Sequence, residues 1–410
     1  MFGYEIRKLL RSPIALAVAL LLLAGCMAVN GTVYRNRVPA EYNALATALE
    51  GPLSMENYAA LAAKEARAKG LFGQAVFANT PFDASLVMKR DGGGYAAGEK
   101  VAAERSPVWG FDTDTEEQRN AVSALFMNYD ALMRQTEKWD EKAETARQTL
   151  EWFEGGVNYE TRRAERVIQA AEDMQAPQRF FNPQEGGKLL ESFLYGVWAL
   201  LFVLILSALL AGAEQQAGVL PLTQATCRRS RILWTKLLCV PVLAAVGICV
   251  ELICALAFHP AAWPALLSGR LQNYLAETGD SYSLMKTLLV GAGVKFAVLT
   301  GIGWMVCFFT RICGSAAGGL AAGGILVFLP VVLQLAGNMT GWPWMEAVYL
   351  HSPFALASGR ELWVRTAYEN FWGFPLTVRE AGLLIWLPVS LLAAVGYRKL
   401  SGLSGRLAVA

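Results

Sequence analysis

Histidine and cysteine, the side chains that most often bind transition metals, are scarce or poorly placed in this sequence. The chain has only 2 histidines, His259 and His351, and 7 cysteines, none of which lies between residues 31 and 189. No Cys-x-x-Cys spacing occurs anywhere in the chain. We therefore expect no zinc or di-iron site, and a disulfide framework is excluded for residues 31–189.

Charged side chains are also few. They make up 17% of the chain, against about 25% in an average soluble domain, while 54% of the residues are hydrophobic. Most of the charges gather between residues 31 and 189, and the rest of the chain is largely apolar. The sequence therefore predicts a polar block joined to a membrane block. The net charge of +2 gives no indication for nucleic acid, and basic and aromatic residues do not interleave, so we expect no nucleic-acid partner.

The motifs of common hydrolases and ATPases are missing as well. There is no Gly-x-Ser-x-Gly elbow, no His-Glu-x-x-His helix and no pair of intramembrane aspartates. The phosphate loop of ATPases is absent, because Gly186-Gly187-Lys188 lacks both the upstream Gly and the following Ser or Thr. We therefore expect no catalytic residue and no cofactor in this chain. If ATP drives the protein, hydrolysis is expected on a separate subunit.

Six apolar runs are long enough to cross a bilayer of about 30 Å. The first starts at Pro13, behind an amphipathic stretch (residues 1–12) that is suited to the membrane interface. The other five are predicted at about residues 193–212, 233–258, 287–309, 315–335 and 381–397. The predicted fold is an all-α membrane protein with six transmembrane helices and a large helical extracytoplasmic domain between helices 1 and 2. Its predicted divisions are residues 1–30 (interfacial helix and transmembrane helix 1), 31–189 (extracytoplasmic domain) and 190–410 (transmembrane helices 2–6).

An alternative interpretation exists for the first apolar run. Leu23-Ala24-Gly25-Cys26 is similar to a lipoprotein cleavage box, after a basic and an apolar region. The run continues through Met27, Ala28 and Val29, which favours a retained span. Both interpretations place residue 31 outside, and the lipidation of Cys26 stays open.

The polar block reads as helical. Thr115-Glu116-Glu117-Gln118 predicts a capping box and the start of a long helix that reaches Gly155-Gly156, while Gly92-Gly93-Gly94 predicts a flexible break. A second helix near residues 159–174 predicts an antiparallel hairpin. The long helix carries a stripe of heptad spacing, made of Val122, Leu125, Tyr129, Leu132, Thr136, Trp139, Ala143, Ala146, Leu150 and Phe153. This stripe is either buried within the domain or binds a partner.

Basic residues mark one side of the predicted membrane block. Cytoplasmic loops of membrane proteins carry an excess of Lys and Arg. Four segments of the chain carry such an excess, with Arg7, Lys8, Arg11, Arg228, Arg229, Arg231, Lys236, Arg311, Arg398, Lys399 and Arg406. This pattern predicts a multi-pass protein of the cell membrane with both termini cytoplasmic and residues 31–189 extracytoplasmic.

The segment 213–236, between the second and third predicted spans, has the densest group of these basic residues. Gly218 and Pro221 end the helix that leaves the second span. The stretch that follows has apolar residues on one side and arginines on the other, so it is able to lie flat on the inner surface. The defining residues are Glu214, Gly218, Leu220, Arg228, Arg229, Arg231 and Lys236. Two interpretations stay open: an ordinary positive-inside loop, or a transverse helix that a cytosolic ATPase moves.

Parts of the chain resemble the permeases of ABC-2-type transporters. They are Tyr4-Glu5-Ile6-Arg7-Lys8-Leu9-Leu10-Arg11-Ser12-Pro13 ahead of the first span, Glu214-x3-Gly218-x-Leu220 with Arg231 and Lys236, and His351-Ser352-Pro353-Phe354. The second is similar to the coupling segment of that family, and the third lies in an aromatic-rich stretch similar to its re-entrant hairpin. The resemblance covers the ends and residues 190–400, and residues 31–189 have no pattern assignable to it. It implies a dimer with a second permease copy, identical or not, in contact with membrane lipid and with two cytosolic ATPase subunits.

Two kinds of residue inside the predicted spans call for an explanation. Glu251 and Lys295 are ionisable and lie at comparable depths, so they are suited to pair with each other in the interior. They form either a structural ion pair or part of a substrate or proton pathway. The spacings Gly314-x3-Gly318 and Gly319-x3-Gly323 let helices pack closely, either within the chain or at a dimer seam.

Two functions follow as expectations. The first is the permease subunit of an ATP-driven ABC exporter that moves an unidentified substrate, such as a peptide, outward. The second is a membrane sensor or assembly protein that binds peptide or envelope components through the helical domain. The sequence does not name the substrate, and lipids, glycans, drugs and ions fit it as well.

Overall fold

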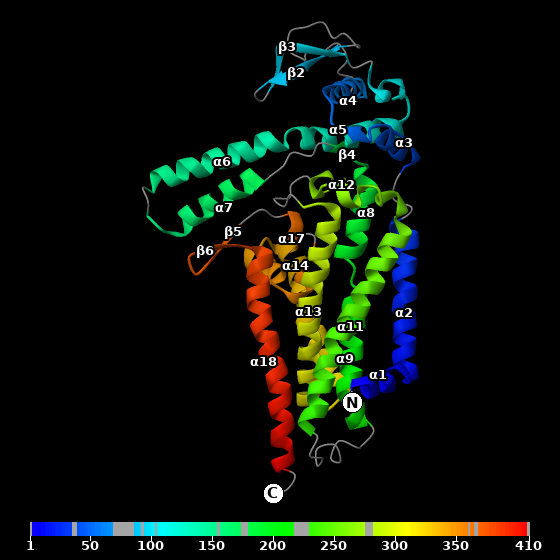
Figure 1. Cartoon of the computed structure of the whole chain (residues 1–410), viewed down its shortest axis with the longest axis vertical. Helices are drawn as coiled ribbons and strands as arrows, with labels where there is room; N and C mark the ends of the chain where they lie inside the picture. The colour runs from blue at the N-terminus through cyan, green and yellow to red at the C-terminus, as the bar shows by residue number, and fades with distance from the viewer. Residues whose placement is uncertain are drawn as a thin grey trace. The chain divides into compact units, whose positions relative to one another are not determined.

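The computed structural model describes residues 2–34, 39–68, 86–91, 94–102, 105–153, 156–173, 179–216, 229–274, 282–359, 361–364 and 368–407 (Figure 1). The chain forms two compact units. The membrane unit comprises Met1–Tyr34, Leu190–Phe258 and Leu288–Ala410, and the polar unit comprises Arg35–Leu189 and His259–Thr287. Residues 259–287, which the predicted divisions placed in the membrane block, therefore belong with the polar unit.

Six helical stretches of the described residues are long and apolar enough to cross a membrane, as predicted. They are built from α2 (Pro13–Val29), α8 (Pro183–Leu194) with α9 (Trp198–Gln216), α11 (Arg229–Phe258), α13 (Leu284–Cys313), α14 (Ala316–Thr340) and α18 (Val378–Leu407). Local signals define the ends. Ser12 caps α2 with Pro13 in its first turn, and Ser315 caps α14, which ends at Gly341 in the left-handed conformation.

The second spanning stretch differs from the single helix that was predicted. It consists of α8 and α9, with residues 195–197 outside helical conformation between them. The first helix of the chain, α1 (Phe2–Leu10), is the predicted amphipathic helix, and it packs against α2 and α11. A short π-helical turn (Asn30–Tyr34) follows α2.

Short elements fill the stretch between α14 and α18. They are α15 (Pro343–Leu350), α16 (Pro353–Ser358), α17 (Glu361–Val364) and the strands β5 (Tyr368–Phe371) and β6 (Phe374–Thr377). α15 and α16 both pack against α14, and α16 also contacts α18. β5 and β6 form an antiparallel hairpin in which Phe371 lies opposite Phe374. The described residues of this aromatic-rich stretch are therefore a folded part of the membrane unit.

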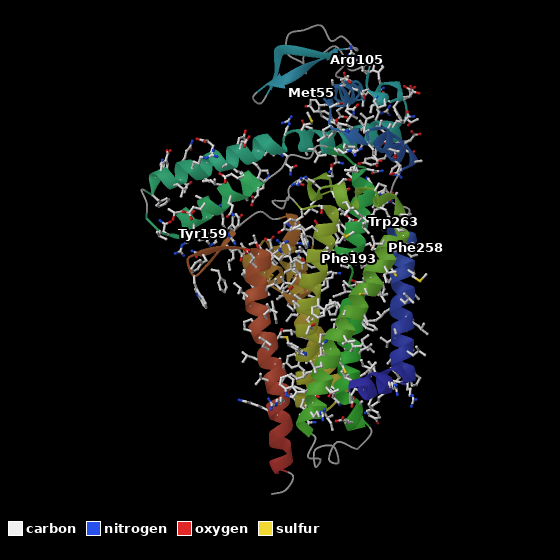
Figure 2. The ribbon with its side chains drawn as sticks, viewed as in Figure 1. Met55, Arg105, Tyr159, Phe193, Phe258 and Trp263 are labelled. Carbon is white, nitrogen blue, oxygen red and sulfur yellow. The ribbon has the colours of Figure 1, made fainter. Side chains whose placement is uncertain are left out.

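The polar unit is mainly helical, as predicted, with some strand. Its elements are α3 (Ala40–Ala48), β1 (Gly51–Pro52), α4 (Met55–Ala68), β2 (Leu86–Asp91), β3 (Gly94–Ala102), η4 (Pro107–Gly110), α5 (Glu116–Met133), α6 (Gln135–Trp152), α7 (Tyr159–Asp173) and β4 (Arg179–Phe180), with η5 (Pro260–Ala262), α12 (Ala265–Ser268) and η6 (Leu271–Asn273) from the later loop. The core lies among α3, α4 and α5, where Leu45, Leu61 and Leu125 are fully buried. Met55 packs against this core, and Arg105 forms an ion pair of 3.6 Å with Glu56 on α4 (Figure 2).

One prediction for the polar unit is wrong in detail, because the long helix is divided at Arg134 into α5 and α6. Of the glycine run predicted as a flexible break, Gly94 opens strand β3, and Gly92 and Gly93 lie outside the described residues. The capping box at Thr115 and Gln118 is confirmed, and so is the helical hairpin, since α6 and α7 pack side by side (Figure 1).

The heptad stripe is largely buried within the polar unit. Its α5 members Val122, Leu125 and Tyr129 belong to the core, and Trp139 on α6 is 7% exposed. The stripe loses its cover near the end of α6, where Trp152 is 87% exposed and Phe153 is 43% exposed. Most of the stripe is therefore buried within the domain, which agrees with the first of its two interpretations.

Candidate functional site

The ends of α9 and α11 are joined by a buried ion pair. Lys236 Nζ lies 3.0 Å from Glu214 Oε1, and the two side chains are 1% and 9% exposed. Breaking a buried ion pair by removing one partner costs about 3–5 kcal/mol, because the remaining charge is left without compensation. The sequence placed both residues in one segment without predicting that they meet.

The rest of the predicted segment 213–236 is only partly visible. Gly218, Leu220 and Arg228 lie outside the described residues. Arg229 opens α11 and Arg231 is exposed in its first turn. The predicted transverse helix falls on residues 217–228, which lie outside the described residues. The structure does show that the two helix ends flanking them are held together.

Apolar packing fixes this end of the membrane unit. Val240 and Leu237 of α11, Cys307 of α13 and Tyr397 of α18 form one buried cluster, in which each is at most 2% exposed. Trp304 of α13 donates a hydrogen bond of 3.0 Å from its indole N–H to the carbonyl of Leu237. The end of α11 is therefore held by α13 and α18 as well as by α9.

A second buried ion pair lies in the interior of the membrane unit. Lys295 Nζ on α13 is 2.9 Å from Glu251 Oε2 on α11, and the side chains are 3% and 2% exposed. This confirms the pairing predicted from their depths. The ammonium of Lys295 also donates to the carbonyl of Gly196 at 3.0 Å and to that of Phe193, and it lies over the Phe193 ring, 5.0 Å from the centroid.

The ion pair provides hydrogen-bond partners for the two helix ends at the break between α8 and α9. The last carbonyls of a helix and the first N–H groups of the next lack partners within their own helices. The ammonium of Lys295 donates hydrogen bonds to carbonyls at the end of α8. Glu251 Oε1 accepts a hydrogen bond of 2.7 Å from the backbone N–H of Ala199 in the first turn of α9. Each charge also has the sign that favours its helix end. The pair is therefore structural in this conformation, because its hydrogen-bonding capacity is used within the chain.

Gly196 explains why this break is possible. A Cβ atom there would lie 2.8 Å from the carbonyl oxygen of Ser192 and 3.0 Å from Glu251 Oε1. Any larger residue would push Glu251 away from the helix ends. A glycine at this point of an apolar run was the available sequence signal for the break, and the sequence reading missed it.

Nearby polar groups link α2 to the end of α8. The amide of Asn30 donates to the carbonyl of Cys26 at 2.8 Å, and Ser192 donates its hydroxyl to Asn30. Cys26 is 2% exposed within the membrane unit. The lipoprotein interpretation of Cys26 is not decided by this position.

The predicted glycine spacings have three different roles. Gly314 has φ +66 and forms the turn between α13 and α14. The predicted role of Gly314 in helix packing is therefore wrong. Gly318 faces the side chain of Cys313 at the preceding turn. At Gly319 and Gly323 a Cβ would lie 2.5 Å from Thr310 Cα and 2.6 Å from Val306 Cγ2, both on α13. These two glycines therefore pack α14 against α13 within the chain.

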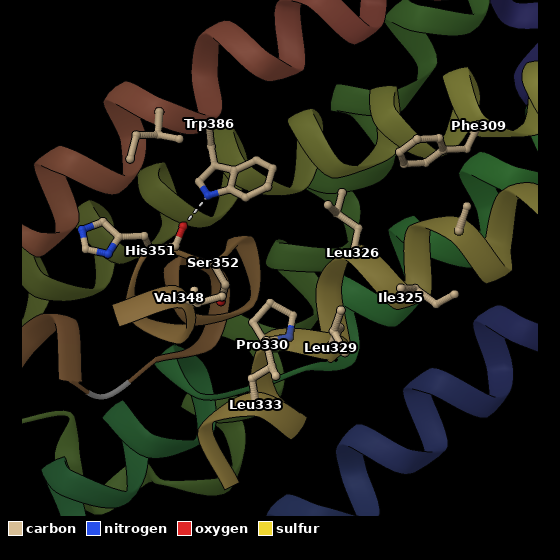
Figure 3. Close-up of a pocket in the computed structure, with 12 residues that line it drawn as sticks. Phe309, Ile325, Leu326, Leu329, Pro330, Leu333, Val348, His351, Ser352 and Trp386 are labelled. Carbon is tan, nitrogen blue, oxygen red and sulfur yellow. Dashed lines mark hydrogen bonds between the residues drawn. The ribbon is translucent and has the colours of Figure 1, made fainter. Parts of the chain in front are cut away.

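A cavity of about 520 Å³ lies between α14 and α18, beneath the α15–α16 turn (Figure 3). Its wall is apolar, with Leu326, Leu329 and Pro330 on one side and Trp386 on the other. The indole N–H of Trp386 donates to the carbonyl of His351 (Figure 3). Because its few polar groups already have hydrogen-bond partners within the chain, this cavity is suited to an apolar molecule.

The two histidines serve the fold. His351 Nε2 lies 2.6 Å from Glu369 Oε2, which ties the α15–α16 turn to strand β5. His259 is 2% exposed in the polar unit. Burial lowers the pKa of His259, with nearby Glu185 acting in the opposite direction. Among the described residues, no group of three or more His, Cys, Asp or Glu is placed to hold a metal ion.

No family model, curated protein or solved structure matches this chain.

Proposed function

We propose that this chain is the membrane-spanning subunit of an ATP-driven ABC exporter of the ABC-2 type. It works as a dimer with a second permease copy, identical or different, and with a cytosolic ATPase subunit that carries the ATP chemistry. It lies in the cell membrane with both termini cytoplasmic and residues 31–189 extracytoplasmic. It moves a substrate outward, such as a peptide met by the extracytoplasmic part. The resemblance of the chain to ABC-2 permeases and its six apolar helical stretches support this proposal.

The observation that carries the proposal is the ion pair between Glu214 and Lys236. A motor that pushes on residues 217–228 acts on the end of α9 and the start of α11. Because the two ends are joined by a buried ion pair, a push on the segment moves both helices together.

The connection between α9 and α11 extends to their opposite ends. There Glu251 of α11 accepts the backbone N–H of Ala199 in α9. At the same end, one helical turn along α11, Gly247 lets the two helices approach closely, since a Cβ there would lie 3.2 Å from Ala199 Cα. We infer that α9 and α11 act as one rigid lever, which carries movement from the segment to the break at 195–197.

Purification from native membranes tests this function. We expect an ATPase subunit to co-purify with the chain, and the ATPase rate of the complex to differ from that of the isolated subunit. Lys236→Met should remove this difference, because it uncouples the end of α9 from the start of α11, on which the segment acts. Lys399→Met removes the same charge at an exposed site of α18 and should leave the ATPase rate unchanged. Isolation of the chain as a stable, partner-free protein from native membranes would refute the proposal.

The α6–α7 hairpin favours a second function, that of a sensor or assembly protein. Trp152 is 87% exposed and Val157 is 78% exposed where the two helices of this hairpin connect. An exposed aromatic residue beside an exposed aliphatic one is typical of a protein-binding surface. If this function is correct, Trp152→Ala should abolish the protein's activity in the cell while Lys236→Met leaves it intact.

A further inference from the structure

A second cavity, of about 220 Å³, lies beneath α1 in the membrane unit. Side chains from α1, α2, α9 and α11 line it, and it opens to the surface beside Leu16 and Val246, which are 53% and 48% exposed. Helix α1 lies across the end of α2 (Figure 1). Leu16, Phe202, Leu206 and Val246 are among its apolar lining residues. It shares no lining residue with the cavity of Figure 3.

Glu5 is the charged residue in the wall of this cavity. The residue is 7% exposed, and its carboxylate has no hydrogen bond or ion pair among the residues that the structure describes. The other buried glutamates of the membrane unit differ, since Glu214 and Glu251 each pair with a lysine. A buried carboxylate is stable only with a cation or hydrogen-bond donors beside it. Among the described lining residues, Cys239 offers Glu5 only a weakly donating thiol and none offers a positive charge, so a cationic donor suits Glu5 best.

The size and wall of the cavity restrict the rest of the ligand. A volume of about 220 Å³ is below the roughly 300–1,000 Å³ of sites for drug-sized molecules. A single alkyl chain fits such a space, whereas a two-chain lipid or a polycyclic compound does not. An alkyl chain gains little by leaving the bilayer for an apolar cavity, because the lipid tails are equally apolar. Selectivity must therefore come from the group that meets Glu5.

We propose that this cavity binds a single-chain amphiphile with a protonated amine, whose ammonium pairs with Glu5. The alkyl chain lies along Leu16, Phe202 and Val246, between α2, α9 and α11. The bound amine supplies the missing partner of Glu5 and fixes α1 against the membrane helices. This inference does not depend on the proposed transport function.

Photolabelling of the full chain in phosphatidylcholine nanodiscs tests the site. The probe is dodecylamine with a diazirine near the end of its chain, and the matched probe is dodecanol with the same diazirine. A charge-assisted hydrogen bond is worth about 1.5–3 kcal/mol, which corresponds to roughly 10–100-fold in affinity. We expect the amine to label the segments of Leu16, Phe202 and Val246 at least about tenfold more strongly than the alcohol does.

Three variants sharpen the test. Glu5→Gln should reduce labelling by the amine to the level of the alcohol, because it removes the charge and keeps the shape. Ala19→Phe fills the cavity and should reduce labelling by both probes at this site. Glu116→Gln changes an exposed carboxylate of the polar unit and should leave labelling unchanged.

Equal labelling by the two probes in the unaltered chain would overturn the proposal, as would strong amine labelling of these segments in a folded Glu5→Gln variant. Labels spread over the exposed lipid-facing residues, such as Leu20 and Leu21, would also overturn it. Size-exclusion chromatography shows whether each variant is folded. If Glu5→Gln does not fold, the ratio of the two probes in the unaltered chain and the result for Ala19→Phe decide the question.

Discussion

The ion pair between Glu251 and Lys295 allows a sharp test of how the membrane unit is held together. Lys295→Met keeps the length of the side chain but removes its charge and its three donors. The variant leaves the Glu251 carboxylate without its cation, and the carbonyls of Phe193 and Gly196 without the ammonium.

The expected magnitude follows from the burial of both groups. Each side chain is at most 3% exposed, so water does not replace the lost partner. Removal of one member of such a pair costs about 3–5 kcal/mol. Glu251→Gln retains an acceptor for the N–H of Ala199 but leaves the lysine charge uncompensated, so we expect a loss of about 2–3 kcal/mol.

The double variant distinguishes a coupled pair from two separate losses. With both charges removed, neither member is left as an isolated buried ion. We expect the double variant to lose at least about 2 kcal/mol less than the sum of the two single losses. The assay is the unfolding of the purified chain in mild detergent, followed by tryptophan fluorescence as the denaturing detergent is increased.

Lys286→Met is the matched control, because Lys286 is an exposed lysine on the same helix, α13. It should change the free energy of unfolding by no more than about 0.5 kcal/mol. Losses in the two single variants that add within about 0.5 kcal/mol in the double variant would refute the coupling. The break between α8 and α9 would then be held by other contacts.

Three further predictions concern a helix contact, a helix start and a buried histidine. Gly319→Ala should lower the free energy of unfolding by about 1–3 kcal/mol, because the added methyl group overlaps α13. Gly324→Ala should be neutral, because nothing lies within 4 Å of the added Cβ. Equal effects of the two variants in a thermal unfolding assay would contradict the packing. Thr115→Ala should cost about 1 kcal/mol by removing the α5 cap, seen as faster amide hydrogen exchange in the first turn of α5, and unchanged exchange would show that the cap is not needed. Burial lowers the pKa of His259 in the folded chain, so stability should be full above about pH 6.5 and fall as the pH drops below it, because the unfolded chain takes up the proton first. His259→Gln should flatten that decline in unfolding experiments between pH 7.5 and 5.5, and an unchanged slope would assign it to other groups.

Hydrophobicity alone predicted the membrane part of the fold well. The six apolar stretches, the amphipathic α1 and the cap at Thr115 all follow from residues close together in the chain, and the structure confirms them. The strands β2 and β3 were missed because the helix-forming composition around them dominates the local signal. The division at Arg134 was missed because the apolar spacing continues across it.

The candidate sites show where local information ends. The sequence identified Glu251 and Lys295 as partners because an isolated charge in a membrane span is too costly. It also determined that residues 213–236 carry basic charge between two apolar runs. These conclusions need only the residue types and their distances along the chain.

Only the tertiary structure decided what those residues do for one another. The ion pair of Glu214 with Lys236 closes across 22 positions, and Lys295 reaches carbonyls about 100 positions away. Such contacts depend on which helices become neighbours, and the burial of apolar faces selects those neighbours without leaving a local pattern. For the same reason, the cavity beside Glu5 was invisible in the sequence: it exists because four helices meet around it.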